Sequence, residues 1–141
     1  LEKETEMLAK KTIQFGYEGR VTAIHAISLA THKKKYRNYV YALAKDAGLS
    51  FVSCPTAWLD HKRTEMEMPF HNALTPTDEL VRAGLVVALG TDNIHDIYKP
   101  YCNGDLRTEL RVLLEGNKIY NQETLLDIAT RNGSFVCGET K

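Results

Sequence analysis

The chain of 141 residues lacks an excess of charge of either sign. Lysine and arginine together number 18, as do aspartate and glutamate, so the formal net charge is zero. No basic cluster is interleaved with aromatic residues, as grooves that bind nucleic acid require, and we therefore expect no nucleic-acid partner. The run Lys33-Lys34-Lys35 is instead expected to form the exposed first turn of a helix.

Cysteine and long apolar runs are also scarce. The 3 cysteines are widely spaced and odd in number, which argues against a disulfide framework and against a Cys-x-x-Cys metal site. The expected setting is therefore reducing and cytoplasmic. No apolar stretch is long enough to cross a bilayer, and residues 1–20 lack a signal-peptide core, so no membrane partner is expected. Leu1, Leu8 and Phe15 stand at heptad spacing and predict a charged surface helix over residues 1–15.

What the chain does contain is a continuous apolar run over residues 85–89, bounded by Gly84 and by Gly90-Thr91-Asp92. Such a run predicts a fully buried strand. The carboxyl ends of strands carry the chemistry in parallel α/β folds, so Asp92 is a candidate functional residue. An Asp after Gly-Thr is also typical of a capped turn or helix, and that alternative stands beside the functional one.

Strands and helices are predicted to alternate along the chain. The predicted strands cover 21–25, 49–54 and the run that starts at Leu85. The predicted helices cover 1–15, 33–47 and 75–84, a segment marked by Leu106, Leu110 and Leu113, and about 122–131, where Asn132-Gly133 ends the last one. Thr75 is the expected N-cap of the third helix, with Pro76 at its first position. Two irregular stretches, 55–74 and 93–104, interrupt the alternation.

This order predicts a parallel sheet with right-handed crossovers. A sheet of three strands would leave two bare edges, so residues 1–141 are expected to form one segment of a larger domain. Strict alternation along the strands places two polar residues on the faces that carry small side chains. Those faces hold Val21, Ala23 and His25 in the first strand, and Val86, Ala88, Gly90 and Asp92 in the third. His25 and Asp92 are therefore predicted to point into one cavity, although a histidine at a strand end is also typical of a hydrogen-bonded structural residue.

Four segments occur in the order and spacing of the amidohydrolase superfamily: Val21–His25, Phe51–Pro55, Thr75–Leu85 and Leu89–Asn93. They most resemble the branch of cytosine deaminases and related cyclic-amidine and triazine hydrolases. The stretch from Asp92 to Leu106 resembles the loop after the eighth barrel strand of that branch. The resemblance implies an α/β fold, the C-terminal portion of a (β/α)8 TIM barrel with parallel strands and flanking helices, incomplete in this chain.

The resemblance also implies roles for individual residues. The Asp at the position of Asp92 ligates a divalent metal, Zn2+ or Fe2+, and takes a proton from the attacking water, while the His at the position of His25 polarises the group under attack. A metal lowers the pKa of its bound water, which a neighbouring carboxylate can then deprotonate. The candidate substrate-binding residues are Asp96, Trp58, His61 and Asn93.

The departures from the family pattern limit this expectation. No His-x-His pair and no strand-five histidine are present, so the remaining metal ligands are expected outside this chain. Trp58 stands where many members have Asn, and Asn93 where some have a second acid. The His-x-Glu and Pro-Cys-x-x-Cys signature of the smaller zinc deaminases is also missing.

The expected protein is therefore part of a metal-dependent hydrolase or deaminase that cleaves a C–N, non-peptide bond of a small cyclic amidine or nucleobase-like substrate. This chain is expected to be inactive without the N-terminal half of the barrel, supplied by the same gene product or by another chain. Two alternatives stay open. One is a non-catalytic α/β module that binds a ligand or partner and completes its sheet as a homo-oligomer; the other is an amidohydrolase that opens a cyclic amide.

Overall fold

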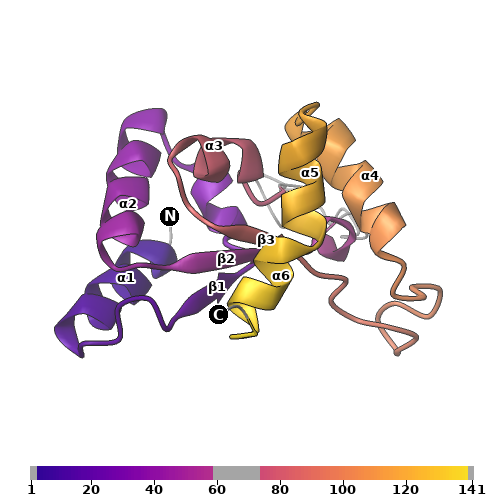
Figure 1. Ribbon diagram of the computed structural model, residues 1–141, viewed down its shortest axis with the longest axis horizontal. Coiled ribbons are helices and arrows are strands. Elements are labelled where there is room, and N and C mark those ends of the chain that lie inside the picture. Colours follow the sequence, from indigo (N-terminus) through magenta and orange to yellow (C-terminus); the bar gives the residue numbers. More distant parts are fainter. Residues whose placement is uncertain (1–2, 59–73, 140–141) are drawn as a thin grey trace, which may run out of the picture.

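The structure is a computed structural model that describes residues 3–58 and 74–139, without the side chain of Trp58 (Figure 1). Three strands form one sheet, with six α-helices and two short 3-10 helices around it in this part of the chain. In chain order the elements are α1 (Glu4–Gln14), β1 (Thr22–Ile24), η1 (Ile27–Thr31), α2 (Lys34–Asp46), β2 (Ser50–Ser53), η2 (Pro55–Trp58), α3 (Thr77–Arg82), β3 (Val87–Leu89), α4 (Leu106–Asn117), α5 (Gln122–Ala129) and α6 (Arg131–Val136).

The sheet has the strand order β1-β2-β3, and both pairs of strands are parallel. Ala23 is paired with Phe51, and Phe51 with Val87. The helices α2 and α3 connect successive strands, which is the βαβ arrangement that the alternation of elements predicts. The prediction of a parallel α/β sheet is confirmed.

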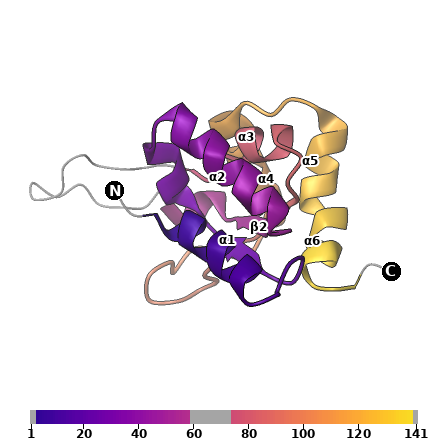
Figure 2. The same cartoon turned by 90° about the vertical axis from the view of Figure 1, so that its left-hand side faces the viewer.

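The main hydrophobic core lies between the sheet and the helices α1, α2 and α3. Phe51, Leu80 and Val87 are fully buried there, and Val40 and Ala44 of α2 pack into the same cluster. Helices α1 and α2 lie side by side against this core (Figure 2). A second cluster of Leu113, Ile119, Leu125 and Ile128 joins α4 and α5 to the β3 side of the sheet. No helix in the described ranges is long and apolar enough to span a membrane.

The structure corrects three local predictions. Helix α1 exists, but its buried side holds Thr5, Ala9 and Thr12, while Phe15 is 63% exposed. Helix α1 therefore packs on α2 with small side chains, and Phe15 of the predicted heptad lies outside this contact. Asn132-Gly133 does not end the helical region: α6 starts at Arg131 and runs through this pair, because Thr130 breaks the helix one residue earlier.

The third correction concerns the start of α3. Pro76 occupies the N-cap position, and no side chain caps the helix. Instead, the Thr75 hydroxyl donates to the backbone carbonyl of His25 at 2.5 Å, and the Thr75 carbonyl accepts from the Thr77 N–H at 2.7 Å. A tertiary hydrogen bond to the end of β1 has taken the place of the expected local cap.

The prediction that Ala23 of the first strand and Ala88 of the third share one face of the sheet was wrong. Paired residues of a parallel sheet project to the same face. Ala23 therefore shares the helix-covered face with Phe51 and Val87, opposite the face of Ala88. The regular strand ends at Ile24, and His25 adopts a left-handed conformation with φ 67°, so strand alternation does not determine where its side chain points.

Candidate functional site

The carboxyl ends of β1 and β3 carry residues with unusual backbone conformations. His25 and Ala26 follow β1 with φ of 67° and 47°, and Asp92 follows β3 with φ of 59°. Residues with a Cβ rarely adopt positive φ, which costs about 1–3 kcal/mol and persists only where surrounding contacts impose it. Such residues cluster at functional sites. His25 and Asp92, the two residues singled out from the sequence, thus both have positive φ beyond the end of a strand.

Hydrogen bonds from neighbouring elements hold the backbone of His25. Its N–H donates to the Val52 carbonyl at 2.8 Å, and its carbonyl accepts from the buried Thr75 hydroxyl. The Thr75 carbonyl in turn accepts from the Asn117 side-chain amide at 2.9 Å. The end of β1 is therefore tied through Thr75 to the last residue of α4.

Asp92 lies on the surface, next to a tightly packed part of the sheet. The Gly90 N–H donates to the Ser53 carbonyl at 2.9 Å, so the β3 backbone continues alongside β2 beyond its last regular residue. A Cβ on Gly90 would stand 3.0 Å from the Cys54 sulfur and 2.9 Å from Val52 Cγ1. Any larger residue at position 90 would therefore clash with Val52 and Cys54 unless their side chains moved. The Asp92 side chain, two residues further on, is exposed.

The thiol of Cys54, the residue after β2, is influenced by the carboxylates of Asp92 and of Glu109 in α4. Burial raises the pKa of its thiol to about 11, and the negative charges of Asp92 and Glu109 act in the same direction. The thiol is thus neutral near pH 7, and it lies close enough to both carboxylates to be affected by their charges. Cys54 was not singled out from the sequence as a site residue.

The loop after β3 is organised by Asp96. Its carboxylate accepts from the side-chain amide of Asn93, and from the backbone N–H groups of Tyr98 at 2.9 Å and Lys99 at 2.7 Å. The hydrogen bond from Asn93, and next the one from the Lys99 backbone, lower the pKa of Asp96. The structure therefore brings Asn93 and Asp96 together, and these bonds shape the loop.

A cavity of about 530 Å3 lies between this loop and α4. Its lining consists of Thr56, residues 98–103, Asp105, Thr108 and Glu109. Glu109 is 2% exposed, and its carboxylate accepts from the N–H of Thr56 at 2.9 Å and from the Thr56 hydroxyl at 2.5 Å. Sequence reasoning missed Glu109. The available signal was an acid at a position of the apolar stripe formed by Leu106, Leu110 and Leu113.

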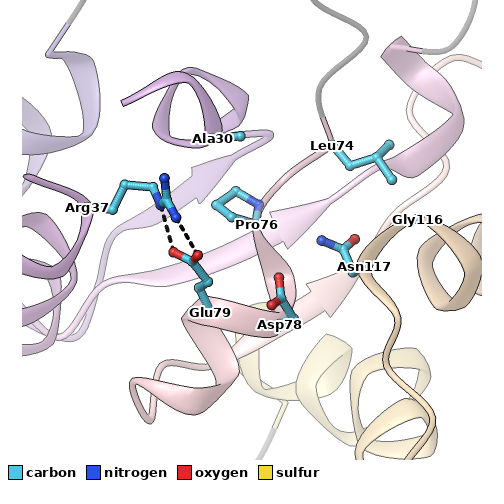
Figure 3. Close-up of a pocket in the computed structure, with 8 residues that line it drawn as sticks. All are labelled: Ala30, Arg37, Leu74, Pro76, Asp78, Glu79, Gly116 and Asn117. Atoms are coloured by element: carbon cyan, nitrogen blue, oxygen red, sulfur yellow. Dashed lines mark hydrogen bonds and ion pairs between the residues drawn. The ribbon is translucent and has the colours of Figure 1, made fainter. Parts of the chain in front are cut away.

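A second cavity, of about 490 Å3, lies between η1, α2, α3 and the end of α4 (Figure 3). The guanidinium of Arg37 points at the carboxylate of Glu79 on its wall and forms an ion pair at 2.5 Å. Arg37, and then the Tyr41 hydroxyl at 2.8 Å, lower the pKa of Glu79 to about 2. None of the candidate residues that the structure describes, His25, Asp92, Asn93 and Asp96, lines this cavity.

The described residues do not form a complete metal site. They contain no group of three or more His, Cys, Asp or Glu side chains that could hold an ion. Asp92 is an exposed carboxylate, a group that can serve as one metal ligand, but a complete site would need further donors. Trp58 ends η2, but its side chain, like the whole of His61, lies outside the described residues, so these two predictions stay untested.

Comparison with known proteins identifies the family. Residues 2–141 match the model of the amidohydrolase family. The chain is 30% identical over 125 residues to a pterin deaminase of Rhizobium rhizogenes, which is 88% of this chain and 28% of that protein. It is 35% identical over 99 residues to an N-isopropylammelide isopropyl amidohydrolase of a Pseudomonas strain, which is 70% of this chain and 21% of that protein. The chain belongs to the amidohydrolase family.

The solved structures agree with this placement. The crystal structure of 5-methylcytosine deaminase from Klebsiella pneumoniae, liganded with 5-fluorocytosine, superposes with a TM-score of 0.85 at 27% identity, over 96% of this chain and 34% of that one. The chain therefore spans about a third or less of the length of the proteins that it matches. Its three parallel strands correspond to part of an amidohydrolase TIM barrel, as the resemblance in the sequence implied.

Proposed function

We propose that this chain is the C-terminal portion of a metal-dependent amidohydrolase that hydrolyses a C–N, non-peptide bond of a cyclic amidine or nucleobase-like substrate. The observation that carries the proposal is the exposed carboxylate of Asp92, in a left-handed conformation three residues after the last strand ends. The names of the matched proteins support the reaction class, since two are deaminases and one is an isopropyl amidohydrolase.

The proposal includes a partner, the N-terminal half of the barrel. Within the described residues the sheet ends at β1 on one side and at β3 on the other. Strands with unpaired edges are usually covered or paired, and closing a barrel is one way to pair both. The missing half belongs to the same polypeptide or to another chain, and it supplies the remaining metal ligands.

Asp92 would supply one carboxylate ligand to Zn2+ or Fe2+, and the metal would lower the pKa of a water molecule in the site toward neutrality. Asp92 accepts the proton that this water loses when its oxygen bonds to the ring carbon. The same carboxylate then returns that proton to the departing nitrogen, so that the C–N bond breaks and ammonia or an amine leaves. His25 stabilises the negative charge that develops on the ring under attack.

The test is Asp92→Asn in the completed barrel, with this chain joined to or co-expressed with an N-terminal half. The amide cannot accept the proton, so ammonia or amine release on pyrimidine, pterin and triazine substrates is expected to fall at least roughly a hundredfold. Bound metal, measured by elemental analysis, is expected to fall as well. Asp46→Asn, at an exposed position at the end of α2, is the matched control and is expected to match the parent.

Undiminished activity of Asp92→Asn would remove this residue from the mechanism. The product separates the two hydrolase alternatives: a deaminase releases ammonia or an amine from an intact ring, whereas an enzyme that opens a cyclic amide yields a ring-opened acid. A completed barrel that binds metal but hydrolyses none of these substrates would favour the non-catalytic module.

A further inference from the structure

Glu109 is a buried acid that the proposed chemistry does not use. It lies in the first turns of α4, on the side that packs against η2, and is 2% exposed. Burial of a carboxylate is costly unless its oxygens accept hydrogen bonds. Both oxygens of Glu109 do so, and both donors belong to Thr56 of η2.

These two bonds act on a short helix that has few bonds of its own. The first N–H groups of any helix have no partner within the helix, and η2 covers only Pro55–Trp58. The carboxylate of Glu109 supplies an acceptor for one such N–H and also binds the hydroxyl of the same residue. Hydrogen bonds to a carboxylate are stronger than those between neutral groups, so the bidentate contact determines where η2 sits relative to α4.

Helix η2 lies at the end of the sheet that carries Asp92, beside the 530 Å3 cavity, which neither Asp92 nor His25 lines. It follows β2 directly, beginning one residue after Cys54, whose thiol is influenced by both Asp92 and Glu109. Thr56 and Glu109 together form one wall of the 530 Å3 cavity, and residues 98–103 of the loop after β3 form another. The Thr56–Glu109 contact thus links the segment after β2 to the segment after β3 at the end of the sheet that carries Asp92.

We propose that Glu109 is a positioning residue that fixes η2 as a wall of the substrate site, an inference that rests on the proposed hydrolase function. It acts through Thr56 and touches neither the metal nor the reacting atoms. Its removal is therefore expected to weaken substrate binding more than it slows the chemical step.

Four variants of the completed barrel test this. Glu109→Gln keeps the size of the side chain but leaves only one oxygen to accept from two donors, and Thr56→Val removes the hydroxyl donor. Both are expected to raise KM by about five- to tenfold while kcat changes less than about twofold. Thr56→Ser retains both donors and is expected to restore the parent KM. Glu115→Gln is the matched control on α4, because Glu115 is exposed and forms an ion pair with Arg111 one turn away, at 3.0 Å.

Amide hydrogen exchange provides a readout that does not depend on activity. The Thr56 N–H is expected to exchange at least roughly ten times faster in Glu109→Gln than in the parent, while amides of α5 are unchanged. Parent-like exchange at Thr56, or a parent-like KM in both Glu109→Gln and Thr56→Val, would overturn the inference. A parent barrel without any hydrolytic activity would refute the proposed function instead, and the exchange measurement would still decide whether Glu109 holds η2. If Glu109→Gln fails to fold, the KM of Thr56→Val decides, and a parent-like value overturns the inference.

Discussion

The two faces of the sheet differ in how completely they are packed. On the helix-covered face, Ala23, Phe51 and Val87 lie side by side and are 6%, 0% and 0% exposed. On the opposite face, Ile24 of β1 is 60% exposed although it is a strand residue next to Ala23. Thr22 and Ser50 on that face satisfy each other through a hydroxyl–hydroxyl contact at 2.8 Å. The helix-covered face is thus buried at all three paired positions, whereas the opposite face is buried at Ser50 and Ala88 but open at Ile24.

This asymmetry is what part of a barrel predicts. In a (β/α)8 barrel the helices cover the outside of the sheet, while the inside is filled by side chains from all the strands. Three strands and their helices can form the outer layer of their own part of a barrel. They cannot supply the side chains that the other strands of the barrel would place in its interior. The coverage of about a third of the 5-methylcytosine deaminase chain accords with this reading.

The largest expected effect comes from breaking the complete face. Phe51→Ala removes a fully buried ring between the sheet and its helices, and is expected to lower the free energy of unfolding by about 3–5 kcal/mol. Ile24→Ala on the open face is expected to cost less than about 0.5 kcal/mol in this chain. Urea unfolding followed by circular dichroism measures both. In the completed barrel the cost of Ile24→Ala is expected to rise to about 2–4 kcal/mol; equal costs in both contexts would contradict the comparison.

An intermediate effect is expected from the ion pair between the helices of the complete layer. Arg37 and Glu79 side chains are 18% and 21% exposed, so Glu79→Gln is expected to cost about 2–3 kcal/mol at pH 7, below the loss for a fully buried pair. The pKa of Glu79 is lowered from 4.5 to about 2 in the folded chain. Its contribution is therefore present above pH 4.5 and is lost as the pH falls toward 2.

Urea titrations of the parent and of Glu79→Gln at several pH values measure this contribution. The difference in unfolding free energy between the two proteins is expected to shrink between pH 4.5 and 2. Arg111 and Glu115, an exposed pair on α4, provide the control, because Glu115→Gln is expected to change stability by less than about 0.5 kcal/mol. A difference for Glu79→Gln that is independent of pH would exclude the ion pair as its cause.

The smallest expected effect tests the packing beside Asp92. Gly90→Ala places a Cβ 2.9 Å from Val52 Cγ1 and 3.0 Å from the Cys54 sulfur, so a loss of about 1–2 kcal/mol is expected. Gly133 in α6 has no atom within 4 Å of the corresponding position, and Gly133→Ala is expected to stabilise by up to about 1 kcal/mol. Thermal unfolding compares the two. A neutral Gly90→Ala would show that the open face has room where the structure places the sulfur.

Most of the fold could be predicted from the sequence because hydrophobic periodicity and glycine boundaries are local signals. They indicated all three strands and their parallel order, and each helix up to α5 within a few residues. The errors arose where a tertiary contact outweighed a local preference. Thr75 looked like a helix cap, but its hydroxyl binds the carbonyl of His25, and the face of α1 was chosen by α2 rather than by its largest side chains.

The candidate site was predictable only in part. His25 follows β1 directly and Asp92 lies three residues after β3, so sequence order alone places them at the carboxyl end of a parallel sheet. Their left-handed conformations could not be predicted from residue type alone, because His and Asp are enriched at positive φ among non-glycine residues but adopt it in only a minority of cases. The pairing of Glu109 with Thr56 spans 53 positions, so no local pattern could reveal the partner, even though an acid in an apolar stripe marked the position.

The hydrogen bonds from the Thr75 hydroxyl to the His25 carbonyl, and from the Asn117 amide to the Thr75 carbonyl, connect the last residue of α4 to the backbone of His25. A substitution at Asn117 would remove a hydrogen bond to Thr75. Through Thr75 it would change the position of the backbone that carries the His25 imidazole. Relatives could thus diverge in reactivity by changes at a helix terminus while every side chain facing the substrate stays the same.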